Sequence, residues 1–168
     1  MFRFFYYLFT RLSFVPPNVR LGKNVRIGKF CNIYGPTYIG DNTKLGAYVE
    51  IQNFVHIGDN CKISSHSFIC SGVRINRKVF IGHGVIFIND SKPRACNENG
   101  KLQNENDWIL KTTEIRNRAS IGSNATIMPV TIGYKSMIGA GAVVTKNIPD
   151  KEVWLGNPAR LHKIIDES

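Results

Sequence analysis

Two of the four histidines, His66 and His83, are the side chains of this chain best suited to acid–base chemistry near neutral pH. Both lie in the middle of the chain, and His83 stands six residues before Asn89. An imidazole beside a reacting group can accept its proton or orient it. His83 is therefore the candidate base or orienting group, whereas His56 and His162 are expected on the surface.

A set of polar residues recurs at an interval of 18 positions: Asn53, Ser71 and Asn89. The same interval separates Ser65 from His83. If the chain completes one coil every 18 residues, Ser65 and His83 share one corner of that coil. Asn53, Ser71 and Asn89 then form a polar ladder at the adjacent corner, and we interpret this ladder as the wall of a substrate cleft.

The spacing of the aliphatic residues predicts such a coil. Between residues 21 and 87 every sixth position is apolar, namely Leu21, Ile27, Ile33, Ile39, Leu45, Ile51, Ile57, Ile63, Ile69, Ile75, Ile81 and Phe87. The residue two positions earlier is small or β-branched, and the residue after is often glycine. A period of six fits neither a helix nor an ordinary strand, so we read it as an internal repeat. Three hexads make one triangular coil, and the aliphatic side chains point inward. The prediction is an all-β solenoid of parallel strands.

The repeat is interrupted once and ends in segments of other composition. Residues 89–111 are polar and form one long loop insertion, which in a solenoid usually serves function. The hexads then resume at Ile115 and include one step of five residues, from Ile127 to Ile132. We expect the coil domain over residues 18–157 and a short C-terminal helix over 158–168.

Residues 1–17 are aromatic and basic up to a Pro-Pro pair, and two interpretations remain open for them. The first is a cap over the open end of the coil, and the second is a segment at a membrane surface. The apolar run is too short to span a bilayer. No small-residue cleavage site of a signal peptide follows it.

The net charge and the cysteine content indicate which ligands and which compartment to expect. The net charge of +10 favours an anionic partner. No nucleic-acid-binding motif is present, so a phosphorylated cofactor and a phosphorylated substrate explain the charge equally well. The four cysteines show no paired spacing for zinc, and we expect them to be reduced, which points to the cytoplasm.

The hexads resemble those of the hexapeptide-repeat acyltransferases, whose coil is a left-handed parallel β-helix. The segments from Phe80 to Asp90, Pro93-Arg94-Ala95, residues 97–102 and Asp107-Trp108 narrow the resemblance to bacterial nucleotide-sugar N-acetyltransferases. Residues 119–127 and 143–146 extend it. The resemblance implies acetylation of an amino group on a nucleotide-linked sugar, with acetyl-CoA as co-substrate, for surface polysaccharide such as O-antigen or capsule. Ser71 departs from the family, because a glutamate is common at its position.

The resemblance also implies roles for individual residues. Asn89 would sit by the sugar amine, with His83 as the second catalytic candidate. Arg94 would bind the substrate through phosphate, and Asp90 would bind the amine or orient the loop. His66 and Ser71 are candidates for substrate binding from their corner positions, not from the resemblance. The residues that would hold CoA are Ala119, Gly139, Ala140, Gly141, Ala142, Lys146, Arg160 and Lys163.

The family packs as homotrimers with each site between two chains, so the resemblance implies a trimer here. A zinc-binding member of this repeat class uses an H-x-x-x-x-H pair, which is absent, so no metal is expected. Two alternatives remain open. One is an O-acetyltransferase on a polysaccharide, lipid-linked sugar or serine, and the other is a non-catalytic trimeric scaffold that binds anions.

Overall fold

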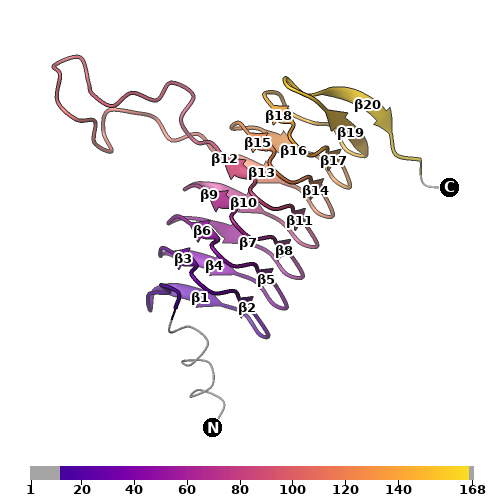
Figure 1. Cartoon of the computed structure of the whole chain (residues 1–168), viewed down its shortest axis with the longest axis horizontal. Helices are drawn as coiled ribbons and strands as arrows, with labels where there is room; N and C mark the ends of the chain where they lie inside the picture. The colour runs from indigo at the N-terminus through magenta and orange to yellow at the C-terminus, as the bar shows by residue number, and fades with distance from the viewer. Residues whose placement is uncertain (1–11, 167–168) are drawn as a thin grey trace, which may run out of the picture.

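The aliphatic residue of each hexad ends a short strand, and the residues after it turn a corner. The computed structural model describes residues 12–166, in which these strands stack into a triangular coil (Figure 1). Each coil contributes one strand to each of three sheets, and the strands of neighbouring coils pair in parallel. The all-β solenoid predicted from the hexads is therefore confirmed.

The strands fall into three sheets. Sheet 1 is formed by β1 (Val19–Leu21), β4 (Thr37–Ile39), β7 (His56–Ile57), β10 (Val73–Ile75), β13 (Thr113–Ile115) and β16 (Thr131–Ile132). Sheet 2 is formed by β2 (Arg26–Ile27), β5 (Lys44–Leu45), β8 (Lys62–Ile63), β11 (Phe80–Ile81), β14 (Ser120–Ile121), β17 (Met137–Ile138), β19 (Glu152–Leu155) and β20 (Arg160–Ile164). Sheet 3 is formed by β3 (Asn32–Ile33), β6 (Glu50–Ile51), β9 (Phe68–Ile69), β12 (Ile86–Phe87), β15 (Thr126–Ile127) and β18 (Val143–Val144). We name the corners by the sheets they join, as the 1–2, 2–3 and 3–1 corners.

The core is a set of aliphatic ladders that run along the coil axis. Ile39, Ile57 and Ile75 lie in register on neighbouring strands and are fully buried. The ladder continues from Ile75 to Ile115 and on to Ile132, so the five-residue step keeps the register. Burial of one such side chain contributes about 1.5–3 kcal/mol to stability.

Where the small residue of a hexad is polar, its side chain ties one coil to the next. The hydroxyl of Thr43 donates to the carbonyl of Gly58 at 2.9 Å, and that of Ser67 donates to the carbonyl of Gly82, also at 2.9 Å. The Cys61 thiol donates to the carbonyl of Asn76 at 3.0 Å. Buried polar atoms at the corners are thereby satisfied, which the stack requires.

The long loop leaves the stack at the 3–1 corner, between β12 and β13, and extends away from the coils (Figure 1). Strand β10 pairs directly with β13, so the insertion does not interrupt sheet 1. The Lys111 amide donates to the Asn89 carbonyl at 3.0 Å and closes the base of the loop. This position confirms the loop predicted over residues 89–111.

The C-terminal helix expected over 158–168 is wrong for the part that the structure describes. Residues 160–164 form β20 instead, which pairs antiparallel with β19 at the end of sheet 2. Gly156, with a φ of 93°, lies in the turn that reverses the chain. The pairing supplies β20 with backbone partners that local residue spacing does not reveal.

The N-terminal cap or membrane segment falls largely on residues 1–11, outside the described residues. Phe14 lies one coil before Asn32, with which it forms a parallel bridge. The stack thus continues at sheet 3 by part of one further coil. Among residues 12–166 there is no helix long and apolar enough to cross a membrane.

Candidate active site

The polar ladder predicted at the 3–1 corner is present. The Ser71 hydroxyl lies 2.5 Å from the Asn53 Oδ1 atom, and the Asn89 amide nitrogen donates to the Ser71 carbonyl at 3.2 Å. Gln52 also belongs to this group, because its Oε1 atom accepts from the Ser71 amide at 3.1 Å. Sequence reasoning missed Gln52, although its place beside Asn53 at the same corner was the available signal.

Asn89 stands at the head of this ladder, where the loop begins. Its Nδ2 atom is held by Ser71 and its backbone carbonyl by Lys111. Among residues 12–166 no hydrogen-bond donor reaches its Oδ1 atom. The side chain is half-buried, so its orientation is fixed while one acceptor remains available to a ligand. A primary amine is a donor that this acceptor suits.

His83 lies at the 2–3 corner and shares it with Ser65, as the 18-residue interval predicts. The Gly84 amide donates to the Ser65 carbonyl at 3.0 Å, and the His83 amide donates to the Ser123 hydroxyl at 3.1 Å. A hollow of about 270 Å³ is lined by His83, Ser65 and the stems of Lys44 and Lys62. The imidazole is exposed beside this basic hollow.

His83 and Asn89 do not meet within one chain. They lie beyond opposite ends of β12, His83 at the 2–3 corner and Asn89 at the 3–1 corner. His66 precedes His83 by one coil at the 2–3 corner, and its ring stacks on Tyr48 with 4.8 Å between ring centroids. An active site that contains both His83 and Asn89 therefore needs residues from the 2–3 corner and from the 3–1 corner.

Asp90 and Arg94 lie in the loop. The Asp90 carboxylate accepts from the Lys92 amide at 2.8 Å, and the Arg94 guanidinium donates to the Pro93 carbonyl at 2.9 Å. No ion pair holds Arg94 among the described residues, and its side chain is exposed. It is thus available to an anionic ligand, and its role in binding substrate stays a prediction.

The residues proposed for CoA divide between three places. Residues 139–142 form the 2–3 corner of a later coil, two coils beyond His83. Ala140 and Gly141 are exposed there, whereas Ala142 is buried. Ala119 is also buried and lies at the 1–2 corner, so it can offer a ligand only backbone atoms. These five residues remain predictions as cofactor contacts.

The three basic residues predicted for CoA are all exposed. Arg160 directly follows a segment that hydrogen-bonds with β18, where the Ala159 amide donates to the Val143 carbonyl at 2.8 Å. Lys163 lies further along β20. Lys146 follows β18 at its other end, at the 3–1 corner. The structure thus brings Arg160 close to residues 139–142 and places Lys146 across sheet 3 from them.

Titratable groups away from the site have altered pKa values. Burial, together with the nearby Arg74 charge, lowers the pKa of His56. Burial raises the pKa of the Cys70 thiol to about 12. Within residues 12–166 no three His, Cys, Asp or Glu side chains cluster so that they could hold a metal ion.

Two family models match the repeat. Residues 18–53 match "Bacterial transferase hexapeptide (six repeats)", and residues 115–146 match "Hexapeptide repeat of succinyl-transferase". The two matches lie on either side of the loop, in the two halves of the stack.

Curated relatives match over parts of the chain. The dTDP-3-amino-3,6-dideoxy-alpha-D-galactopyranose 3-N-acetyltransferase of Aneurinibacillus thermoaerophilus is 48% identical over 50 residues, which are 29% of this chain and 26% of the relative. The bifunctional protein GlmU of Ruegeria sp. (strain TM1040) is 33% identical over 107 residues, which are 58% of this chain and 22% of the relative. The chain thus spans about a quarter or less of the length of these relatives.

Solved structures share the fold. AntD, an N-acyltransferase from Bacillus cereus in complex with dTDP and 3-hydroxybutyryl-CoA, superposes with a TM-score of 0.76 at 21% identity, covering 99% of this chain and 89% of AntD. PerB from Caulobacter crescentus, in complex with CoA and GDP-perosamine, gives a TM-score of 0.50 at 20% identity over 90% of this chain and 57% of PerB. The repeat, the coil and both family models agree: the chain has hexapeptide repeats and the left-handed parallel β-helix fold, and in both it is similar to the hexapeptide-repeat acyltransferases.

Proposed function

We propose that this protein transfers an acetyl group from acetyl-CoA to the amino group of a nucleotide-linked amino sugar. The observation that carries the proposal is Asn89, whose oriented amide has an open acceptor at the base of the long loop. An amine that donates to this acceptor is held in place with its lone pair still free. The loop beside it offers Arg94 to the phosphates of a nucleotide.

The reaction needs little more than orientation. The neutral amine attacks the thioester carbonyl, a C–N bond forms, and the C–S bond breaks as CoA leaves as thiolate. The proton lost by the nitrogen passes to that thiolate, directly or through His83. Holding two reactants in attack geometry can supply about 7–11 kcal/mol of the barrier, so a strong base is not required.

A cyclic trimer would bring His83 and Asn89 together. All strands of sheet 3 are parallel, so in every coil the 2–3 corner, which carries His83, lies on one side of the sheet. The 3–1 corner, which carries Asn89, lies on the other side. If three copies pack with sheet 3 toward a common axis, the 2–3 corner of each chain, with His83, faces the 3–1 corner of its neighbour, with Asn89. Three equivalent sites form in this way, each from two chains.

The surface of sheet 3 suits this packing. Its outward residues are Asn32, Glu50, Phe68, Ile86, Thr126 and Val143, and none carries a positive charge. By contrast, Arg26, Lys44 and Lys62 lie outward on sheet 2. The loop adds Leu102 and Ile109, which are 78% and 82% exposed and therefore available to a neighbouring chain.

CoA fits along the 2–3 corner of the later coils. Residues 139–142 lie two coils from His83, or roughly 10 Å at the spacing of parallel strands. The arm that carries the thioester would follow this corner toward His83, and Arg160 and Lys163 would meet the phosphates. AntD and PerB were crystallised with CoA or its acyl form and with nucleotides or nucleotide sugars, which supports both ligands.

The activity is tested by thiol release. Wild-type protein is incubated with acetyl-CoA and a panel of dTDP- and GDP-linked sugars that bear an amine or, as matched controls, a hydroxyl at the same carbon. We expect free CoA only with amino sugars and a product that carries one acetyl group. Release of CoA with no member of the panel, while serine or a polysaccharide becomes acetylated, would contradict the proposal.

A further inference from the structure

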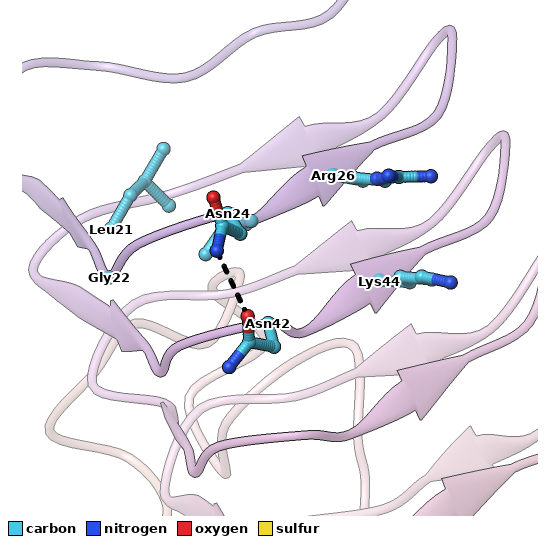
Figure 2. Close-up of a pocket in the computed structure, with 7 residues that line it drawn as sticks. Leu21, Gly22, Asn24, Arg26, Asn42 and Lys44 are labelled. Atoms are coloured by element: carbon cyan, nitrogen blue, oxygen red, sulfur yellow. Dashed lines mark hydrogen bonds between the residues drawn. The ribbon is translucent and has the colours of Figure 1, made fainter.

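Sheet 2 carries three basic residues in one row, which we call the cation column: Arg26, Lys44 and Lys62. They are in register on neighbouring strands, which lie about 4.8 Å apart. Figure 2 shows the first two side chains projecting side by side from β2 and β5. Like charges directly opposite each other destabilise a sheet, so an anion bound between these side chains would relieve their repulsion.

The cation column has no acidic partner among residues 12–166. All three of its side chains are exposed, and none takes part in an ion pair of that part of the chain. The outward residues of the next strands of sheet 2 are Phe80, Ser120 and Met137, none of them acidic. Sheet 2 is also not the face that the proposed trimer buries, so the column stays open to a ligand.

One end of the cation column lies beside His83. The hollow of about 270 Å³ at the 2–3 corner has His83, Lys44 and Lys62 in its lining. The Lys62 ammonium lies 5.6 Å from the centroid of the Phe80 ring, which belongs to the same coil as His83. An anion on Lys44 and Lys62 is therefore held next to the candidate base. It comes from the earlier coils, whereas residues 139–142 lie two coils later.

The other end of the cation column borders a second hollow. It measures about 860 Å³, and Arg26 and Lys44 lie in its lining (Figure 2). There the Asn24 side-chain amide donates to the Asn42 Oδ1 atom at 3.1 Å. Among residues 12–166 nothing bonds to the Asn24 Oδ1 atom or the Asn42 Nδ2 atom, so this asparagine pair offers one acceptor and one donor. The Watson–Crick edge of thymine or uracil carries the complementary N–H and carbonyl groups.

We propose that the cation column binds the diphosphate of the acceptor, an inference that rests on the acetyl transfer proposed above. Lys44 and Lys62 meet the two phosphates, and the sugar extends from them to His83. The nucleoside lies over the first two coils, with its base at the asparagine pair. The three coil spacings from Arg26 to the coil of His83 span roughly 14 Å, which suits an extended nucleotide sugar. The acceptor and CoA then approach His83 from opposite ends of the stack.

A diphosphate can also belong to a lipid-linked sugar, so the probes differ in what the diphosphate carries. Titration calorimetry measures the binding of dTDP, inorganic pyrophosphate and geranyl diphosphate to the full chain, without acetyl-CoA. We expect dTDP to bind more tightly than the other two, because only a nucleoside reaches the asparagine pair. Added salt should weaken the binding, because exposed charges are screened. Geranyl diphosphate bound as tightly as dTDP, or more tightly, would overturn the nucleoside assignment.

Substitutions test each end of the site. Lys44→Gln with Lys62→Gln should raise the dissociation constant for dTDP about tenfold or more, because charge-assisted phosphate contacts are lost. Asn42→Gly, which suits the φ of 57° there, should weaken dTDP and leave pyrophosphate unchanged. The matched control is Lys78→Gln with Arg118→Gln, exposed at the 1–2 corner of later coils, and it should stay within about twofold of wild type. Equal losses in both double variants would overturn the site.

Kinetics separates this inference from the proposed function. In Lys44→Gln with Lys62→Gln, KM for the nucleotide sugar should rise about tenfold with kcat nearly unchanged, because a phosphate contact binds ground state and transition state alike. An unchanged KM in this active variant, with Arg94→Gln raising KM instead, would overturn the phosphate site and leave the reaction standing. Binding of dTDP that depends on Lys44 and Lys62, without acetyl transfer to any amino-sugar nucleotide, would support the site and overturn the reaction.

Discussion

Asn89 is the residue on which the proposed chemistry depends. Its amide is fixed by Ser71 and by the closed base of the loop. We expect Asn89→Ala to lower kcat/KM for the amino-sugar nucleotide by about tenfold or more, the scale of a lost transition-state contact. Steady-state kinetics measures this, and Asn106→Ala in the same loop is the control, since its side chain is exposed. An unchanged rate in Asn89→Ala would remove this residue from the site.

The rate of acylation depends less on His83 when the acceptor is an amine than when it is a hydroxyl. An amine with a pKa near 8 is partly neutral at neutral pH, whereas a hydroxyl needs a base worth about 10² to 10⁴ in rate. We therefore expect His83→Asn to reduce kcat/KM by less than about a hundredfold, with part of the loss recovered as pH rises. Profiles of both proteins from about pH 6 to 9 measure this. A variant inactive at every pH would favour the hydroxyl acceptor.

The coil is the element whose stability should respond to alkaline pH. Cys70 is buried in the core, and burial raises its thiol pKa from 9.0 to about 12. Because the folded pKa exceeds the unfolded one, the contribution of the neutral thiol to stability is complete below about pH 9. It is then lost as pH rises toward 12. The Cys31 and Cys61 thiols shift in the same direction, also because of burial.

Urea unfolding measures this contribution. Between about pH 8 and 10.5 the wild type should lose more unfolding free energy than Cys70→Ala does, because the variant lacks one buried thiol. The comparison uses the slope with pH, so any fixed cost of the smaller side chain cancels. Parallel slopes for the two proteins would contradict the assignment.

The repeat made most of these elements predictable. An aliphatic residue at every sixth position has only the interior of a coil to occupy, and this predicts the ladder through Ile57 and Ile75. The Asn53, Ser71 and Asn89 ladder followed from the same interval. β20 was missed because Leu161, Ile164 and Ile165 are spaced as on a helix, and the pairing with β19 that decides the outcome is not local.

The residue spacing in one chain does not determine how several chains pack against one another. The interval places His83 and Asn89 at neighbouring corners, but only contact between copies can join these corners in one site. The outward row of sheet 3 carries no positive charge, which favours this face for the contact that we propose. We therefore predict for the whole molecule that the active site is shared between chains, as the resemblance also implies.

Mixed trimers test whether sites are shared. His83→Asn and Asn89→Ala chains, each impaired alone, are unfolded together and refolded. In every trimer that contains both variants, one of the three shared sites has both wild-type residues. We expect the mixture to be more active than the sum of its parts, at up to about a quarter of wild-type activity per site. Strictly additive activity, with trimers present by light scattering, would place each site within one chain.

The chemical identity of the product shows whether this protein acetylates the amine of a sugar nucleotide. Wild-type protein is supplied with acetyl-CoA and an amino-sugar nucleotide that also carries free hydroxyls, and the product is treated with alkaline hydroxylamine before mass spectrometry. An amide survives this treatment, whereas an acetyl ester is cleaved. We expect one acetyl group per molecule, retained in full after treatment and formed in the same amount as released CoA. Loss of the acetyl group on treatment, or no transfer to the sugar nucleotide at all, would contradict this expectation.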